Sequence, residues 1–425
     1  MFDLLVEGGH VVEPGGLRRR TLAVQDGRIA ALLEPGAGEA KAKIDASGCI
    51  VLPGLVDAHV HFREPGLTHK EDFDSGSRAA ALGGVTTVMV MPTDKPMTQN
   101  AQQFAEKRAL AQGRCRVDFA LQALVGPDLS HVPSLAREGA ISFEIFLGLI
   151  GEKIEDSARL VAALAAVRDA GGIAAVTPYD EGLAAAAPAL PPEVEAAGMA
   201  RAICAQRIAG GRMHLRQVSS ALGLAALALA GPGVTSEVTP HNLLLTRETL
   251  TRLGAVAKVV PPLRSEDDTL AMRQALAAGR ISIVATDHAP HTPQEKDAGL
   301  AKAPGGFPGV QTMLPLLLKL VADGALSHAD LVRVACEQPA RIFGLYPRKG
   351  SLQPGADADL VLVDPSRPMQ IRNADQASKA GRTPFDGWTV PATPRMTLLR
   401  GEALCVDGKI VGEPRGRFVS PLVYT

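Results

Sequence analysis

Short apolar runs separated by turn signals occur at both ends of the chain. Near the N-terminus they cover residues 4–6, 11–12, 22–24 and 29–32, with a turn at Asp26-Gly27. Near the C-terminus they cover residues 359–363 and 397–411, with a turn at Asp407-Gly408. Chain ends often lie close together in a domain. The pattern therefore predicts a small β-sandwich domain assembled from residues 1–51 and 346–425.

The middle of the chain alternates strand-like and helix-like segments. Helix-like stretches rich in Ala, Leu, Arg and Glu, such as 156–170 and 193–208, separate the strands. The apolar or β-branched strand-like runs are residues 50–56, 85–91, 117–124, 141–147, 173–176, 213–218, 235–238 and 281–285. Eight such alternations favour a parallel barrel over an open sheet. We therefore predict an α/β protein with a (β/α)8 TIM-type barrel over residues 52–345.

Composition excludes several classes of protein. The net charge of −1 provides no basic field for nucleic acid or anionic lipid. The five cysteines include no CxxC pair, which argues against a disulfide framework. The first residues lack the pattern of a signal peptide, and no apolar run approaches the roughly 20 residues of a membrane span. The sequence predicts a cytoplasmic protein that binds neither nucleic acid nor membrane.

Two histidines stand at the end of the first predicted barrel strand. His59 and His61 are two residues apart, so both imidazoles point to the same side of a strand. In a barrel, that side can be the mouth where catalytic groups collect. Two converging imidazoles are a natural start for a zinc site. The alternative is a pair of ordinary strand histidines.

An aspartate follows the last predicted barrel strand. Asp287 stands two residues after the run 281–285, and in a closed barrel the last strand neighbours the first. Asp287 is therefore expected to meet His59 and His61 at one metal. A carboxylate there can also accept a proton from water and pass it to a leaving nitrogen. The alternative for Asp287 is the N-cap of a helix.

The motifs around these residues resemble those of one enzyme family. HVHFREPG at residues 59–66 and ATDHAPHT at residues 285–292 are similar to motifs of the class I dihydroorotases, which are cyclic amidohydrolases. Further matching segments, found in the same order along nearly the whole chain, are residues 69–73, 83–87, 91–92, 237–241, 261–264, 305–309, 339–343 and 383–388. The resemblance implies a metal-dependent cyclic amidohydrolase, with reversible ring opening of dihydroorotate to N-carbamoyl-aspartate in pyrimidine biosynthesis.

The resemblance also implies roles for individual residues. His59, His61 and Asp287 would bind zinc, and Asp287 would also act as the catalytic base. The planar fork of Arg63 suits a substrate carboxylate. The resemblance implies further substrate contacts from His291 and from the glycine backbone at Gly305 and Gly306.

The second metal of the family lacks its usual ligands here. Thr177 and Gln217 occupy the positions of two histidines, and neither side chain competes well with imidazole for zinc. His214 is retained but is expected to face differently. Glu144 stands where related hydantoinases have a carboxylated lysine, so it is a candidate fourth ligand. The alternative is an ion pair between Glu144 and a nearby cation. We expect one zinc per chain.

Substrate contacts differ from the family pattern, which leaves three functions open. Thr93 and Val260 replace two asparagines that bind dihydroorotate in the family; Thr93 retains a hydroxyl that could serve this purpose. The chain is expected to be a cyclic amidohydrolase resembling dihydroorotase. One alternative is a catalytically inactive partner of aspartate transcarbamoylase, and the other is a ureide hydrolase similar to hydantoinase or allantoinase. A homodimer is a further expectation.

The remaining site-like residues have weaker signals. Tyr179 lies in the vacated ligand region, and His241 is expected beside the metal ligands but not among them. The other histidines are expected on the surface or in loops: His10, His69, His131 and His328.

Overall fold

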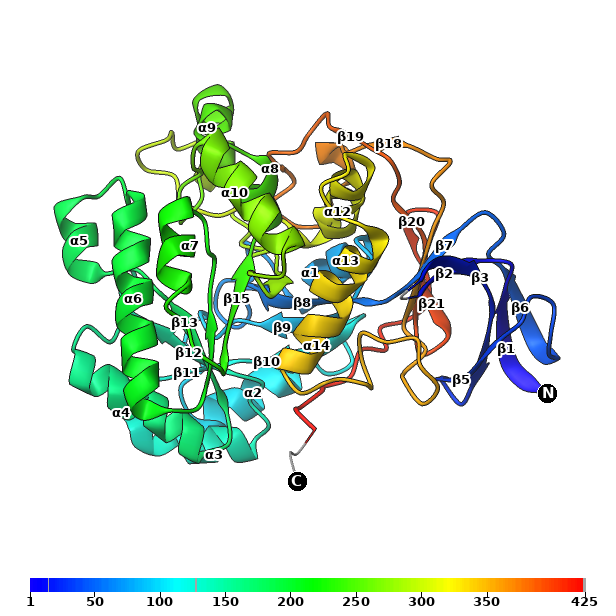
Figure 1. Ribbon diagram of the computed structural model, residues 1–425, viewed down its shortest axis with the longest axis horizontal. Coiled ribbons are helices and arrows are strands. Elements are labelled where there is room, and N and C mark those ends of the chain that lie inside the picture. Colours follow the sequence, from blue (N-terminus) through cyan, green and yellow to red (C-terminus); the bar gives the residue numbers. More distant parts are fainter. Residues whose placement is uncertain (14, 127, 423–425) are drawn as a thin grey trace.

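The computed structural model describes residues 1–13, 15–126 and 128–422. Figure 1 shows a barrel surrounded by helices and, to its right, a β-rich domain that contains the N-terminus. The predicted combination of a TIM-type barrel and a terminal β domain is confirmed. No helix in the described ranges is long and apolar enough to cross a membrane.

The barrel wall consists of parallel strands that are almost entirely buried. Such burial on both faces explains their continuous apolar sequences. The strands are β8 (Leu55–Val60), β9 (Val85–Val90), β10 (Asp118–Leu121), β11 (Ala123–Leu124), β12 (Phe143–Phe146), β13 (Ile173–Thr177), β14 (Arg212–Leu215), β15 (Val234–Val238) and β16 (Ile283–Val284). Strands β10 and β11 together form one side of the barrel, with Gln122 between them.

The first and last strands meet, so the barrel closes. Val60 forms a parallel bridge with His288, and the His61 N–H donates to the His288 carbonyl over 2.8 Å. Next to this bridge, the buried Asp57 carboxylate accepts a hydrogen bond from the Thr286 N–H over 3.0 Å. This seam brings the segment containing His59 beside the segment containing Asp287.

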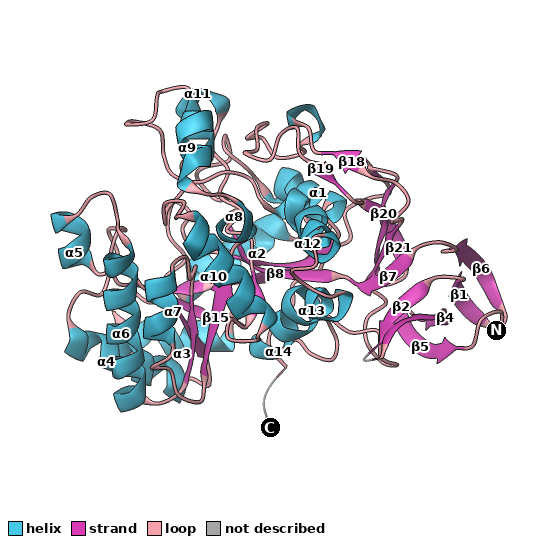
Figure 2. Ribbon diagram, turned by 45° about the horizontal axis from the view of Figure 1, so that its top comes forward, coloured by secondary structure: helices cyan, strands magenta, loops and turns pink. Residues whose placement is uncertain are grey.

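Helices cover the outside of the barrel (Figure 2). Several begin at side-chain caps; for example, Asp156 accepts a hydrogen bond from the N–H of Arg159 at the start of α4. The helices are α1 (Phe73–Leu82), α2 (Ala101–Ala111), α3 (Val132–Arg137), α4 (Ser157–Asp169), α5 (Glu181–Ala186), α6 (Pro192–Ala209), α7 (Ala221–Leu227), α8 (Pro240–Leu244), α9 (Arg247–Leu253), α10 (Glu266–Ala277), α11 (Pro293–Lys296), α12 (Met313–Ala322), α13 (His328–Val332) and α14 (Gln338–Ile342).

The terminal domain consists of two sheets that share one hydrophobic core. A four-stranded sheet has the order β5-β4-β1-β6, and a seven-stranded sheet has the order β22-β21-β20-β17-β7-β2-β3. The strands are β1 (Phe2–Glu7), β2 (His10–Glu13), β3 (Gly16–Arg19), β4 (Thr21–Gln25), β5 (Arg28–Leu33), β6 (Ala40–Asp45), β7 (Ile50–Pro53), β17 (Leu360–Val363), β20 (Pro394–Leu399), β21 (Glu402–Val406) and β22 (Lys409–Ile410). Strand β7 pairs with both β2 and β17, so the two ends of the chain share one sheet.

One predicted strand is divided between the two parts of the molecule. The run 50–56 was expected to be a single barrel strand, but β7 belongs to the terminal sheet and β8 belongs to the barrel. Gly54 stands between them. A Cβ at this position would lie 2.0 Å from the Thr86 hydroxyl oxygen, so only glycine lets the chain pass so close to β9.

Two stretches predicted for the terminal domain contact the barrel. Ile371, Phe385 and Val390 pack with barrel residues in one apolar cluster, near the hairpin of β18 (Met369–Gln370) and β19 (Thr389–Val390). Farther along, Phe418 forms a bridge with Phe119 of β10. The domain boundaries at residues 51 and 345 remain a prediction.

Candidate metal centre and active site

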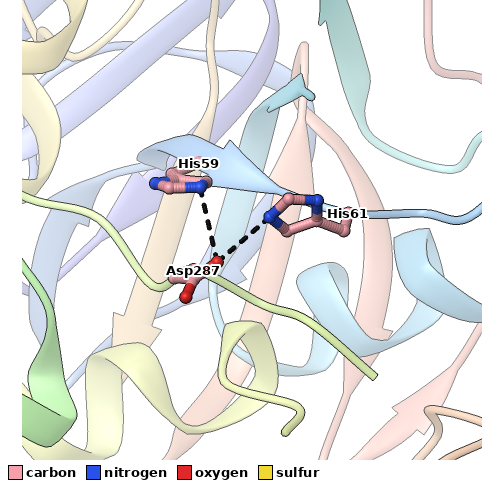
Figure 3. A group of neighbouring side chains, drawn as sticks. All are labelled: His59, His61 and Asp287. Atoms are coloured by element: carbon pink, nitrogen blue, oxygen red, sulfur yellow. Dashed lines mark hydrogen bonds and ion pairs between the residues drawn. The ribbon is translucent and has the colours of Figure 1, made fainter. Parts of the chain in front are cut away.

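Three of the predicted ligands converge at the mouth of the barrel. His59 Nε2 lies 3.3 Å from Asp287 Oδ1, and His61 Nε2 lies 3.1 Å from the same oxygen (Figure 3). The ligand atoms of the three residues all lie within 4.8 Å of one another. Two imidazole nitrogens and one carboxylate oxygen are a donor set that zinc accepts. The residues present therefore fit a single metal ion.

The other nitrogen of each imidazole already has a partner. His59 Nδ1 lies 2.6 Å from Glu237 Oε1, and His61 Nδ1 lies 2.7 Å from the Thr93 hydroxyl. A carboxylate at Nδ1 holds the proton there and leaves Nε2 unprotonated, as in the carboxylate–histidine pairs of zinc sites. Burial opposes protonation of His59, but Glu237 and Asp287 outweigh it and raise the pKa of His59. Burial and Arg63 lower the pKa of His61 well below its usual range.

A hydrogen bond to the second carboxylate oxygen fixes the orientation of Asp287. Gln217 Nε2 donates to Asp287 Oδ2 over 2.7 Å, which directs Oδ1 toward the two histidines. Burial raises the pKa of Asp287. Asp287, Gln217 and Arg63 all have backbone φ between 48° and 60°, a left-handed conformation that is rare for side chains of this size. Backbone strain of this kind is often concentrated at functional sites.

Glu144 does not join the metal group. Its carboxylate is fully buried and accepts hydrogen bonds from Arg216 Nε over 3.1 Å and from the Thr177 hydroxyl over 2.7 Å. These donors occupy the oxygens that a metal would need. The structure therefore shows the ion pair that the sequence left as the alternative. The proposed role of Glu144 as fourth ligand does not fit these contacts.

Arg63 and His291 lie together beside the metal group. Arg63 Nη2 lies 3.4 Å from His291 Nε2, and His291 contacts the Gly305 carbonyl over 3.1 Å and Lys70 Nζ over 3.3 Å. Burial, Arg63 and Lys70 lower the pKa of His291 to about 3, so its imidazole is neutral near pH 7. The buried Nε of Arg63 has no hydrogen-bond partner in the described part of the chain, and Asp287 and Asp94 are the nearby carboxylates that act most strongly on its charge.

The predicted glycines line the same corner of the site. A Cβ on Gly306 would lie 2.6 Å from the Ala289 carbonyl oxygen and 3.3 Å from the His291 ring. Lys296 Nζ donates to the Pro304 carbonyl over 3.0 Å, and this hydrogen bond fixes the loop that contains the two glycines. Thr93 has a partner that the sequence did not predict: its hydroxyl contacts His61 and thus orients a metal ligand.

Other candidate residues are also buried nearby. His214 is fully buried, its Nε2 contacts Glu237 over 3.1 Å and its Nδ1 contacts Thr235 over 2.8 Å, and it is not one of the three residues that form the metal group. The hydroxyl of Tyr179 and the Nε2 atom of His241 are buried and have no hydrogen-bond partner among the residues that the structure describes. His10, His69 and His131 are exposed and His328 is half-buried, consistent with the predicted surface or loop positions.

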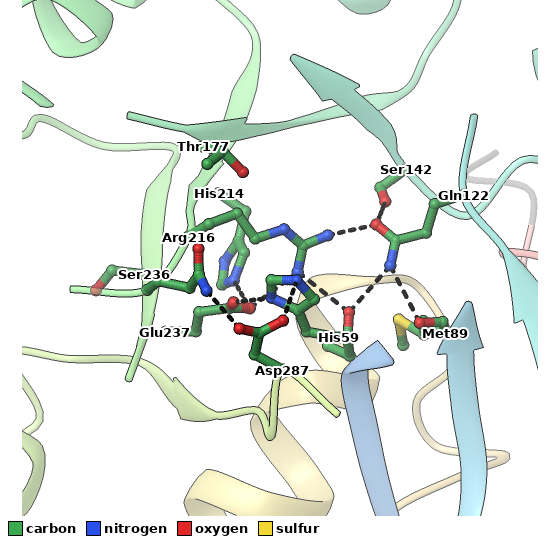
Figure 4. A network of polar contacts seen from close by, with 12 residues as sticks. His59, Met89, Gln122, Ser142, Thr177, His214, Arg216, Ser236, Glu237 and Asp287 are labelled. Carbon is green, nitrogen blue, oxygen red and sulfur yellow. Dashed lines mark hydrogen bonds and ion pairs between the residues drawn. The ribbon is translucent and has the colours of Figure 1, made fainter. Parts of the chain in front are cut away.

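The most important contacts missed by the sequence analysis involve Glu237 and Arg216. Both side chains are completely buried, and Arg216 Nη1 donates to Glu237 Oε2 over 2.9 Å (Figure 4). Glu237 is the penultimate residue of β15 (Val234–Val238), and a charged residue inside a barrel strand was a usable signal. Arg216 lies two residues after His214, so the period of a strand already placed both on the same side.

A second cluster of carboxylates lies at the junction of the two domains. Asp118, Asp357 and Asp359 are close enough together to hold a metal. Lys349 Nζ lies among them, 2.5 Å from Asp118 and 2.8 Å from each of the other two aspartates. An ammonium group therefore fills this cluster.

Comparison with known proteins agrees with this geometry. The model of the amidohydrolase family matches residues 50–411. The dihydroorotase of Methanothermobacter thermautotrophicus is 36% identical, with 99% of this chain and 97% of that protein covered. The allantoinase of Rubrobacter xylanophilus is 37% identical, with 99% and 98% covered. Among solved structures, the L-hydantoinase (dihydropyrimidinase) of Arthrobacter aurescens superposes with a TM-score of 0.94 at 32% identity, covering 99% of this chain and 100% of the other.

The barrel, the two histidines at the end of β8 and the aspartate after β16 define a metal-dependent hydrolase. The chain belongs to the amidohydrolase family. Within this family it is similar over its whole length to enzymes named for action on cyclic amides and ureides.

Proposed function

We propose that this enzyme opens the ring of dihydroorotate reversibly to N-carbamoyl-aspartate, using one zinc ion. The observation that supports this proposal is the environment of Arg63. Its Nε atom is buried beside the metal group and has no hydrogen-bond partner in the described chain, although buried polar atoms are normally hydrogen-bonded. Dihydroorotate has a carboxylate that would supply this partner. Hydantoin and allantoin do not.

The residues present can perform the proton transfers of the reaction. His59, His61 and Asp287 would hold the zinc, which supplies Lewis-acid chemistry when it is bound. Asp287 accepts a proton from the attacking water, and the water oxygen bonds to the ring carbonyl carbon. As the bond between this carbon and the ring nitrogen breaks, Asp287 passes the proton to that nitrogen. Arg63 and His291 hold the carboxylate while Gly305 and Gly306 border the ring.

The experiment is a comparison of three substrates with the zinc-loaded enzyme. Loss of dihydroorotate, hydantoin and allantoin is followed by chromatography. We expect dihydroorotate to be preferred by at least 100-fold in kcat/KM, and Asp287→Ala to abolish turnover. Arg63→Met should lower kcat/KM for dihydroorotate by on the order of 100-fold, because a charge-assisted bidentate contact is lost. Activity that is unchanged in Asp287→Ala would refute the proposed base.

A ureide hydrolase is the second candidate. The allantoinase relative and the hydantoinase structure favour it. So does Val260, which is 38% exposed and offers no polar side-chain atom for a substrate. Preference for hydantoin or allantoin, unaffected by Arg63→Met, would establish this alternative.

The partner proposals rest on the resemblance alone. A homodimer is expected from size-exclusion chromatography with light scattering. A complex with aspartate transcarbamoylase would appear as co-elution of the two purified proteins. If the chain proves inactive with every substrate but forms this complex, it is the non-catalytic partner instead. The cytoplasmic location also remains a prediction.

A further inference from the structure

The guanidinium of Arg216 lies in the interior of the barrel, close to the metal group. Arg216 is completely buried, and its donors contact four acceptors from four different strands or strand ends (Figure 4). Nε donates to Glu144 over 3.1 Å, and Nη1 donates to Glu237 over 2.9 Å and to the Ala58 carbonyl over 3.1 Å. Nη2 donates to Gln122 Oε1.

The two carboxylates that Arg216 joins both depend on its positive charge. Glu144 and Glu237 are both completely buried, and a buried carboxylate without a counter-charge is several kcal/mol unfavourable. The Nε2 atom of His214 also lies 3.1 Å from Glu237, so an imidazole and two carboxylates surround this space. These three residues are not one of the groups of described residues whose ligand atoms lie close enough together to hold a metal ion. In this chain the guanidinium supplies the positive charge.

The same guanidinium is connected to a proposed metal ligand. Arg216 holds Glu237 Oε2, and Glu237 Oε1 accepts from Nδ1 of His59 over 2.6 Å. The connection therefore fixes the orientation of the His59 ring and leaves Nε2 directed toward Asp287. Gln122 supports the arrangement from the opposite side, because its amide donates to the Ala58 and Met89 carbonyls while its oxygen accepts from Arg216.

We propose that Arg216 is a fixed internal cation that neutralises Glu144 and Glu237 and, through Glu237, positions His59 for the single metal. The inference rests on the proposed function for the existence of that single metal. It makes Arg216 a positioning residue, since no contact of Arg216 reaches the ligand nitrogens or Asp287. It also explains chemically how the barrel keeps two buried acids.

The test is metal stoichiometry and affinity, measured without substrate. Metal-free protein is loaded with excess zinc, unbound zinc is removed, and zinc per chain is determined by elemental analysis. Wild type should hold one zinc per chain. A folded Arg216→Met should bind that zinc 10- to 100-fold more weakly in competition with a chelator, because Glu237 has lost its anchor. An affinity within about 2-fold of wild type would overturn the positioning role.

The double variant Arg216→Met/Glu144→Gln covers the case in which Arg216→Met does not fold. It removes one charge of each sign, so the buried charge stays balanced, and it should hold one zinc per chain. Its zinc affinity in competition with a chelator should be 10- to 100-fold weaker than wild type, because Glu237 has lost its anchor. Unchanged affinity and an unchanged visible spectrum of the cobalt-substituted protein would overturn the positioning role.

Thr177→Val is the matched control. It removes the other donor to Glu144 without altering the cation, so it should hold one zinc with affinity within about 2-fold of wild type. The outcomes also separate the two proposals. Wild type that binds no zinc defeats the proposed function, whereas wild type with one zinc and variants that behave identically defeat only the role of Arg216.

Discussion

Gln217 donates a hydrogen bond to Asp287 from the position where relatives of this enzyme were expected to carry a histidine ligand. The amide and the carboxylate approach to 2.7 Å, and both residues have left-handed backbone conformations. A residue that cannot compete for zinc thus holds the proposed catalytic base.

Replacing Gln217 by Met should weaken this base with little change in volume. A donor to the charged carboxylate lowers its pKa, so removal of the donor should raise the pKa of Asp287 further. We expect kcat/KM for ring opening to fall about 10-fold at pH 7 and the acidic limb of its pH profile to move to higher pH. Gln217→Glu is unsuitable for this test, because it adds a negative charge beside Asp287. A Gln217→Met profile that overlays the wild-type profile would show that the contact has no role.

His291 should make the protein sensitive to acid. Its pKa is lowered to about 3, whereas a histidine in the unfolded chain titrates near 6.5. Between these values the unfolded state binds more protons, so stability falls as pH decreases from about 6.5 toward 3. The contribution is on the order of 3 kcal/mol. Urea midpoints measured from pH 7 to pH 4 should fall less steeply in His291→Gln, and equal slopes in the two proteins would contradict the prediction.

Lys349 should stabilise the folded state. Substituting Met leaves Asp118, Asp357 and Asp359 close together, with Arg400 as a remaining cation on Asp118. We expect a loss of about 3–5 kcal/mol, seen as a clear fall in Tm, because a buried ion cluster loses its central charge. Lys319→Met is the control: its pair with Asp323 is exposed, so the loss should stay within about 0.5 kcal/mol.

Removal of the metal should lower Tm. Zinc at 100 times its Kd stabilises the folded state by about 2.7 kcal/mol if the unfolded chain does not bind it. Dialysis against a chelator should remove this stabilisation, and added zinc should restore it in wild type and in His69→Ala, whose histidine is exposed. His61→Ala should not respond to zinc. A full response of His61→Ala would place the metal elsewhere.

The fold and the metal group were readable from the sequence for a physical reason. Strand period and strand order determine that His59 and His61 share a face and that Asp287 lies across the barrel seam. Local pattern carries this information because each statement concerns one strand or two neighbouring strands. The loss of the second-metal histidines at positions 177 and 217 was visible only because the chain resembles a family whose motifs carry them.

Contacts across the barrel interior could not be predicted in this way. Arg216 reaches Glu144, Gln122 and the Ala58 carbonyl through a long flexible side chain, and the strand period gives its side of the strand but not these partners. The contact of Thr93 with His61 likewise depends on the exact course of a loop. For the same reason, Glu144 could be read equally well as a metal ligand or as half of an ion pair.

The single residue between β7 and β8 has a consequence for anyone who edits this protein. The N–H of Gly54 bonds to Asp359 in the terminal domain, while the N–H of the next residue, Leu55, bonds to Gly84 in the barrel. The terminal domain therefore sets the register of the strand that delivers His59 and His61. One inserted residue at this joint would turn both imidazoles toward the opposite face of the strand. Grafts and truncations should leave this joint intact and cut elsewhere.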